Sequence, residues 1–131
     1  MNPRFVLDTD TVIDLINGSP GVIAQFEARS PDDLAITAVT VSELRLGAIA
    51  SHDPKRGMGD TAAVINELKV LAFGLAEALV HAELRLALRQ RPIGPNDMVV
   101  AATALSVPAV LISSNLREYS RVPNLRVESW R

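Results

Sequence analysis

The sequence contains no cysteine, only two lysines and no long uninterrupted apolar segment. Without cysteine, the chain cannot form a disulfide, a thiol nucleophile or a cysteine-ligated zinc site. Charged or polar residues and proline interrupt the apolar stretches, which argues against a membrane-spanning helix. Asp8 and Asp10 fall where the apolar region of a signal peptide would have to lie, so we expect a cytoplasmic protein.

The remaining composition is that of an ordinary globular domain. The 131 residues are 48% hydrophobic and 21% charged, and we expect one domain spanning residues 1–131. The net charge of −2 provides no global basic field, which argues mildly against a protein that coats nucleic acid. The 13 basic residues are almost all arginine, which serves phosphate binding and surface ion pairs equally well.

Apolar strand-like runs alternate with helical patterns along the chain. Five strands are expected, at residues 4–7, 34–37, 69–73, 109–113 and 125–129. Helices are expected between them, at about 11–17, 19–29, 40–50, 61–68, 76–90 and 94–105. Residues 52–60, "HDPKRGMGD", are predicted to form a loop. This alternation predicts an α/β fold with a mainly parallel sheet, in which ligands bind at the carboxyl ends of the strands.

Two carboxylates, Asp8 and Asp10, stand where the first strand ends, and three interpretations compete. The D-x-D-x-T pattern resembles the haloacid dehalogenase phosphatases, the pair could ligate a metal, or it could cap the next helix. The phosphatase chemistry also needs a lysine and a second acidic motif after a later strand. Lys55 and Lys69 are the only lysines, and "SSN" follows the strand at 109–113. The phosphatase therefore lacks two required parts.

Two other α/β classes fit less well. A response-regulator receiver domain needs an aspartate after its third strand and a lysine after its fifth, and "KVLAFG" and "LRVESW" provide neither. A dinucleotide site needs glycines after the first strand, and none is present there.

Acids that follow different strands could together hold a divalent cation. Asp8 follows the first strand, while Glu43 and Asp97 lie in first turns of predicted helices. Mg²⁺ takes oxygen ligands, commonly a few carboxylates with water and phosphate. Each acid also has a structural interpretation: Asp8 as a helix cap, Glu43 in a capping box with Thr40, and Asp97 as complement to a helix dipole. Spacing alone leaves both interpretations open.

Four segments in succession resemble the motifs of the PIN domain family, in particular the VapC toxins of bacterial toxin–antitoxin pairs. They are "FVLDTDTVIDL", "ITAVTVSELRLGA", "RPIGPNDMVVAATAL" and "LISSNLREYSRVPNLRVESW". The resemblance covers nearly the whole chain, and the last segment is the most specific. It implies a three-layer α/β/α sandwich with a mainly parallel sheet of four to five strands, and Mg²⁺- or Mn²⁺-dependent cleavage of RNA.

The resemblance also assigns the three acids a role. Asp8, Glu43 and Asp97 match the family's metal-binding and catalytic carboxylates. Asp10 would support Asp8 or orient a bound water.

The family's fourth acidic position departs from the common pattern T-x-D-x-x-D-F. Asn115 stands where an aspartate is frequent, Ser113 replaces the threonine, and Glu118 keeps an acid at the second position. Glu118 is therefore included among the catalytic candidates, with Ser113 and Asn115 as supporting residues. The departure puts a second metal site in doubt more than the first.

The resemblance further implies an RNA substrate, with tRNA as the first expectation, a homodimer and a cognate VapB-like antitoxin. Five arginines are candidates for contacting phosphate: Arg85, Arg89, Arg91, Arg117 and Arg121. Neither His52 nor His81 has an acid–base partner at a recognisable spacing. One alternative from another class is a PIN-fold binding module with a weakened nuclease site, kept for its antitoxin contact.

Overall fold

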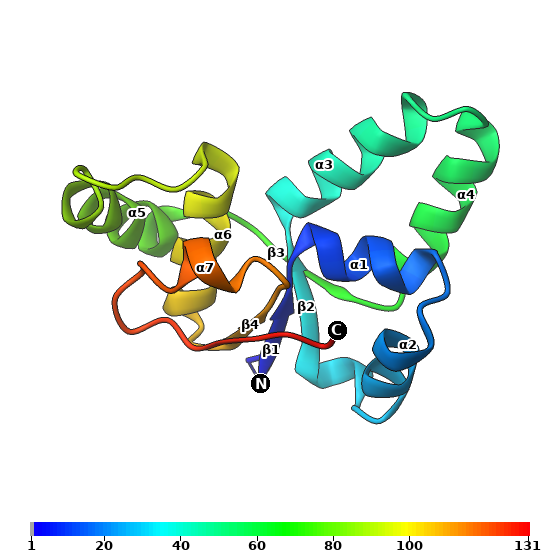
Figure 1. Cartoon of the computed structure of the whole chain (residues 1–131), viewed down its shortest axis with the longest axis horizontal. Coiled ribbons are helices and arrows are strands. Elements are labelled where there is room, and N and C mark those ends of the chain that lie inside the picture. The colour runs from blue at the N-terminus through cyan, green and yellow to red at the C-terminus, as the bar shows by residue number, and fades with distance from the viewer. Residues whose placement is uncertain (1) are drawn as a thin grey trace.

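A computed structural model describes residues 2–131 and has a parallel five-stranded sheet at its centre (Figure 1). The strand order is β3-β2-β1-β4-β5, and all four pairings are parallel. The strands are β1 (Phe5–Leu7), β2 (Leu34–Thr37), β3 (Lys69–Leu71), β4 (Val110–Ile112) and β5 (Val127–Glu128). β2 pairs with one side of β1, and β4 pairs with the other side. The order of the strands in the sheet therefore reverses between β1 and β4.

Helices connect the strands and cover both faces of the sheet (Figure 1). They are α1 (Thr9–Ile16), α2 (Pro20–Glu27), the 3₁₀ turn η1 (Pro31–Asp33), α3 (Ala38–Ile49), α4 (Pro54–Ile65), α5 (Leu75–Ala87), α6 (Pro95–Ser106) and α7 (Leu116–Tyr119). Helices α5 and α6 form one outer layer together with α7, and α1 to α4 lie on the other side. The predicted three-layer α/β/α architecture is confirmed.

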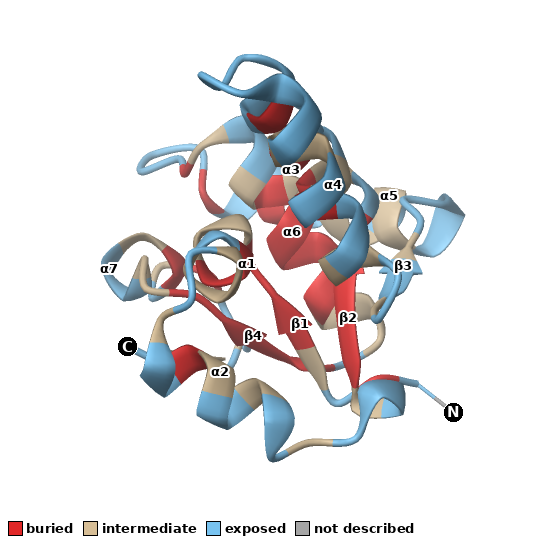
Figure 2. Cartoon of the chain, turned by 90° about the vertical axis from the view of Figure 1, so that its right-hand side faces the viewer, coloured by how far each residue is buried: buried red, intermediate tan, exposed pale blue. Residues whose placement is uncertain are grey.

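The core consists of two apolar clusters, one on each face of the sheet. Val6 and Leu111 pack against α5 and α6, whereas Leu7 and Ile112 pack against the opposite layer. Neighbouring residues of a strand point to opposite faces, so both faces can be apolar at once. Figure 2 shows the result: β1, β2, β4 and much of α6 are buried.

The structure confirms the positions of the five predicted strands, although several are shorter than expected. The prediction of a loop at residues 52–60 is wrong, because α4 begins at Pro54 with Asp53 accepting a hydrogen bond from the Arg56 amide at 3.2 Å. Glycine suggested a loop, but Gly57 allows close packing: a Cβ there would lie 3.2 Å from the Ala48 carbonyl oxygen of α3. The short helix α7 was not predicted.

Within residues 2–131, no helix is both long and apolar enough to cross a membrane.

Candidate metal centre

The three acids singled out by the sequence come from different segments that meet at one edge of the sheet. Asp8 directly follows β1, Glu43 lies on α3 after β2, and Asp97 lies in the first turn of α6. This edge contains the carboxyl ends of the parallel strands, and β1 and β4 flank the point where the strand order reverses. Ligands of open α/β sheets bind at such a point.

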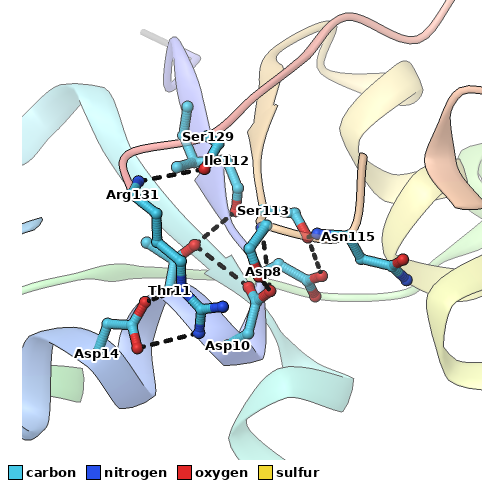
Figure 3. Close-up of polar contacts among 10 residues, drawn as sticks. Asp8, Asp10, Thr11, Asp14, Ile112, Ser113, Asn115, Ser129 and Arg131 are labelled. Atoms are coloured by element: carbon cyan, nitrogen blue, oxygen red, sulfur yellow. Dashed lines mark hydrogen bonds and ion pairs between the residues drawn. The ribbon is translucent and has the colours of Figure 1, made fainter. Parts of the chain in front are cut away.

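Asp8 is held in place by hydrogen bonds to both carboxylate oxygens and is only 6% exposed. Oδ1 accepts from the Thr9 amide at 3.0 Å. Oδ2 accepts from the Ser113 hydroxyl at 2.9 Å (Figure 3). The Asp8 amide donates to the Ile112 carbonyl at 2.8 Å, which ties β1 to β4. Asp8 therefore does cap α1, and the same contacts fix its carboxylate at the sheet edge.

The site concentrates negative charge. Burial raises the pKa of Asp8 to about 6 against the lowering effect of the Ser113 hydrogen bond, and the charges of Asp10 and Asp97 raise it further. Burial likewise raises the pKa of Asp97, with Glu118, Glu43 and Asp10 adding to the shift. Among the described residues, the two salt bridges are Arg56–Asp60 and Arg131–Asp14, so neither carboxylate has a cationic partner.

Glu43 faces the same edge through two contacts. Its Oε1 accepts from the Thr9 hydroxyl at 2.6 Å, and its Oε2 accepts from the Asn96 side chain at 3.4 Å. The alternative of a capping box with Thr40 is wrong, because α3 starts earlier and Thr37 caps it by accepting from the Thr40 amide at 3.1 Å. Glu43 therefore does not cap α3, and its side chain lies between α1 and α6.

Glu118 uses both carboxylate oxygens within the protein. Oε1 accepts from the Gly94 amide at 2.7 Å and Oε2 accepts from the Asn115 side chain at 3.0 Å. These two hydrogen bonds, that from Asn115 first, lower the pKa of Glu118. Since Gly94 precedes the first turn of α6, the contact ties α7 to the helix that carries Asp97. The geometry favours a positioning role for Glu118, and its catalytic role stays a prediction.

The other supporting residues connect α1 to the segment after β4. Asp10 accepts from the Ser114 amide at 3.0 Å and from the Ser114 hydroxyl, while Ser113 contacts Asp8 directly. Asp10 therefore holds the segment that contains Ser113, and Ser113 in turn orients Asp8 by a hydrogen bond. Asp14 lies outside this network and pairs with Arg131 at 2.7 and 3.1 Å (Figure 3).

Sequence reasoning missed three groups that contact the site. Thr9 and Asn96 hydrogen-bond Glu43, and the fully buried Tyr119 lies beside Asp8 and Asp97. Thr9 and Asn96 adjoin Asp8 and Asp97 in the sequence, so proximity to a predicted ligand was an available signal. Nothing in the local sequence around Tyr119 indicates that its hydroxyl reaches the acids.

The candidate RNA-binding arginines lie mainly at the surface. Arg85, Arg91 and Arg117 are exposed, while Arg89 and Arg121 use part of their guanidinium on the Leu86 and Pro92 carbonyls. A hollow of about 310 Å³ opens at the acids and is lined by Glu43, Gly94, Pro95, Asn96 and Asp97. The opening exposes Glu43 and Asp97, whereas Asp8 does not line it.

The residues present fit a divalent cation that keeps part of its hydration. Buried, mutually repelling carboxylates without a cationic partner are stabilised when a cation binds. Within residues 2–131, no three acidic or histidine side chains converge tightly enough to enclose an ion by themselves. Mg²⁺ is commonly bound by one or two carboxylates together with water and substrate phosphate, which matches this arrangement.

The raised pKa of Asp8 predicts an unusual pH dependence in metal-free protein. Folding favours the protonated form, so the contribution of Asp8 to stability is greatest below its unfolded pKa of 3.8 and is lost as the pH rises through about 6. Between pH 5 and 7 the loss should be about 1 kcal/mol, or a few degrees in Tm. Thermal unfolding in chelator, compared with Asp8→Asn, measures it. Parallel pH profiles for the two proteins would contradict the shift.

This fold and this placement of acids define a PIN domain. The model of the PIN domain family matches residues 5–125, and the chain belongs to that family. This match favours the PIN domain over the haloacid dehalogenase phosphatase that the D-x-D-x-T pattern suggested.

Within the family, the chain is similar over nearly its full length to VapC ribonucleases. It is 33% identical to the "tRNA(fMet)-specific endonuclease VapC" of Salmonella typhimurium, covering 97% of this chain and 98% of that protein. It is 32% identical to "Ribonuclease VapC2" of Haemophilus influenzae, with the same coverage.

Solved structures show the same similarity in three dimensions. The DNA-bound VapBC structure from Salmonella typhimurium contains a chain that superposes with a TM-score of 0.93 at 32% identity, covering 98% of this chain and 99% of that one. A chain of Rickettsia felis VapBC2 bound to a promoter DNA fragment superposes with a TM-score of 0.90 at 26% identity, over the same shares.

Proposed function

We propose that this protein is a Mg²⁺- or Mn²⁺-dependent endoribonuclease and the toxin of a toxin–antitoxin pair. The observation that carries the metal dependence is the pair of carboxylates, Asp8 and Asp97, raised in pKa and without a cationic partner at the sheet edge. Relatives named as ribonucleases support RNA as the substrate.

In this proposal each side chain has a distinct task. Asp8 and Asp97 hold the cation, with Glu43 facing it from α3. The Ser113 hydroxyl and the Thr9 amide keep Asp8 in one orientation. Glu118 fixes the start of α6 and hence Asp97. A bound cation would supply an activated water and stabilise charge on the scissile phosphate.

The proposed substrate is tRNA. The Salmonella typhimurium relative is named for tRNA(fMet), and the similarity to it spans nearly both chains. Arg85, Arg91 and Arg117 are exposed and available for the phosphates of a folded RNA. No histidine lies among the hydrogen-bonded groups at the acids, and His81 instead packs edge-on against Phe73.

Attack by water, without use of the RNA 2′-hydroxyl, predicts the chemistry of the cut ends. Cleavage should leave a 5′-phosphate and a 3′-hydroxyl. Ligation-based sequencing of RNA ends after induced expression tests this and identifies the cut site, with Asp97→Asn as the inactive control. Ends carrying a 2′,3′-cyclic phosphate would contradict the mechanism.

A cognate VapB-like antitoxin is the proposed partner, since the similar solved chains come from VapBC assemblies. A groove of about 320 Å³ runs between α1, α3 and α4, and Ile13, Ile16, Leu44 and Ala48 supply its apolar lining. Glu43 lies at the same groove, so a segment bound there could extend to the acidic site.

A homodimer is expected from apolar surface on α5. Leu75, Leu79 and Leu86 share one face of the helix and are 78%, 62% and 64% exposed. Three further apolar residues add nothing to this dimer surface, because they pack against the core: Val64, Ile65 and Leu68. Light scattering should give twice the 14.1 kDa mass of one chain at micromolar concentration.

Leu79→Glu should convert this dimer to a monomer, because a charge would be buried at the interface. Leu46→Glu, at a leucine of α3 that is 64% exposed, is the matched control and should remain dimeric. A wild-type chain that is monomeric at this concentration would contradict the expectation.

A further inference from the structure

The hydroxyl of Tyr119 is a buried polar group that the proposed mechanism does not use. Tyr119 ends α7 and is 0% exposed, with its ring in the apolar cluster between the sheet and α5–α6. Among the described residues, its hydroxyl makes no hydrogen bond of full geometry. Leaving such a group unpaired destabilises the folded chain, whereas phenylalanine would fill the same space without that cost.

The surroundings of this hydroxyl are the acids of the site. Burial and the charges of Asp8 and Asp97 raise the pKa of the Tyr119 phenol, so the group keeps its proton. Hydrogen bonding from the phenol in turn lowers the pKa of Asp97 against the effect of burial. The geometry agrees, because a Cβ at Gly94 would lie 3.3 Å from Asp97 Oδ2 and 3.9 Å from Oε1 of Glu118, the neighbour of Tyr119 on α7. The hydroxyl is therefore near both carboxylates and able to donate to them.

Of the two carboxylates, Asp97 is the one that can accept a further hydrogen bond. Both oxygens of Asp8 already accept hydrogen bonds, from the Thr9 amide and the Ser113 hydroxyl. No other side chain or amide donates to Asp97 within the described part of the chain, although α6 brings it to the same edge.

We propose that Tyr119 is a positioning residue of the acidic site, whose buried hydroxyl donates to Asp97 and fixes that carboxylate toward Asp8. Ser113, in the segment after β4, orients Asp8. Tyr119, at the end of the helix that follows this segment, orients Asp97. One short stretch of chain thus orients both carboxylates. This inference rests on the proposed metal site, and it assigns Tyr119 no contact with RNA.

Tyr119→Phe removes the hydroxyl alone and tests the proposal by calorimetry with Mn²⁺. The affinity should fall by roughly tenfold or more, as expected for a group that orients a metal ligand, and Tm should change little. Half-maximal cleavage should require correspondingly more Mn²⁺. Val122→Ala is the matched control, because Val122 is 4% exposed in the same apolar cluster. It should lower Tm and leave the affinity unchanged.

A second readout needs no metal. In chelator, the Tyr119 hydroxyl proton should give a slowly exchanging, downfield proton resonance that is absent in Tyr119→Phe and shifts in Asp97→Ala. Wild-type protein that binds no Mn²⁺ would overturn the proposed function, while this resonance still decides the role of Tyr119. A Tyr119→Phe affinity within twofold of wild type, or a resonance insensitive to Asp97→Ala, would overturn the positioning role.

Discussion

Replacing Asp97 with asparagine is expected to abolish RNA cleavage while the chain stays folded. Asparagine keeps the shape of the side chain but removes the charge that would hold a cation. Even partners that only orient a metal ligand contribute roughly 10–100-fold, so loss of a ligand should reduce the rate by at least about a hundredfold. Mn²⁺ affinity measured by calorimetry should fall in parallel. Asp8→Asn should behave alike, since Asp8 is the most buried acid of the site.

Asp32→Asn is the control for this experiment, because Asp32 is exposed in η1, before β2, at the opposite edge of the sheet. It should retain full activity and metal binding. Unchanged Mn²⁺ affinity in both Asp8→Asn and Asp97→Asn would disprove the assignment of the site. Equal, negligible cleavage by wild type and Asp97→Asn would instead favour the alternative of a binding module whose nuclease site has weakened.

Filling the groove between α1, α3 and α4 is expected to release the enzyme from its antitoxin. Gly47 lines this groove, and a Cβ at Gly47 would meet no atom within 4 Å, so the side chain of Gly47→Trp can leave the helix without a backbone clash. The indole would occupy the volume that an antitoxin helix needs. Loss of such a contact costs about 2 kcal/mol or more, or roughly thirtyfold in Kd.

Gly59→Trp is the matched control, since a Cβ at Gly59 also meets no atom within 4 Å but the residue does not line the groove. Titration calorimetry with the co-encoded antitoxin should show weakening for Gly47→Trp alone, with cleavage by the free enzyme unchanged in both variants. Equal affinity for Gly47→Trp and wild type would exclude this groove as the antitoxin site.

The charge of the site predicts how the antitoxin inhibits. Carboxylates without a cationic partner attract a guanidinium, which pairs with them bidentately, so we expect an antitoxin arginine at Asp8, Glu43 or Asp97. That arginine and the cation would compete, and inhibition should weaken as Mg²⁺ rises. Replacing the arginine with alanine should restore cleavage. Inhibition that persists after this change and at high Mg²⁺ would point to a block of RNA access instead.

The sequence by itself indicated the order of the strands and the three acids that the structure brings to one edge of the sheet. β1 and β4 carry apolar residues that alternate between two buried faces, so short apolar runs separated by helical patterns already define a parallel sheet. Asp8 follows β1, Asp97 lies in the first turn of α6, and Glu43 lies on the helix after β2, one turn further in than predicted. The carboxyl ends of parallel strands meet at one edge, which brings these acids together. Periodicity and chain direction are local properties, which is why they were readable.

Only the tertiary structure decided how the acids are held and which groups serve them. Gly57 suggested a loop by its local preference, and its role became visible only with α3 packed against it. Glu118 looked like a free acid until the Gly94 amide, 24 residues away in sequence, was seen to bind it. Tyr119 lies beside Asp8 and Asp97 because α7 is tied to the start of α6 by the Glu118–Gly94 contact. Contacts between residues distant in sequence depend on packing, and no local pattern encodes them.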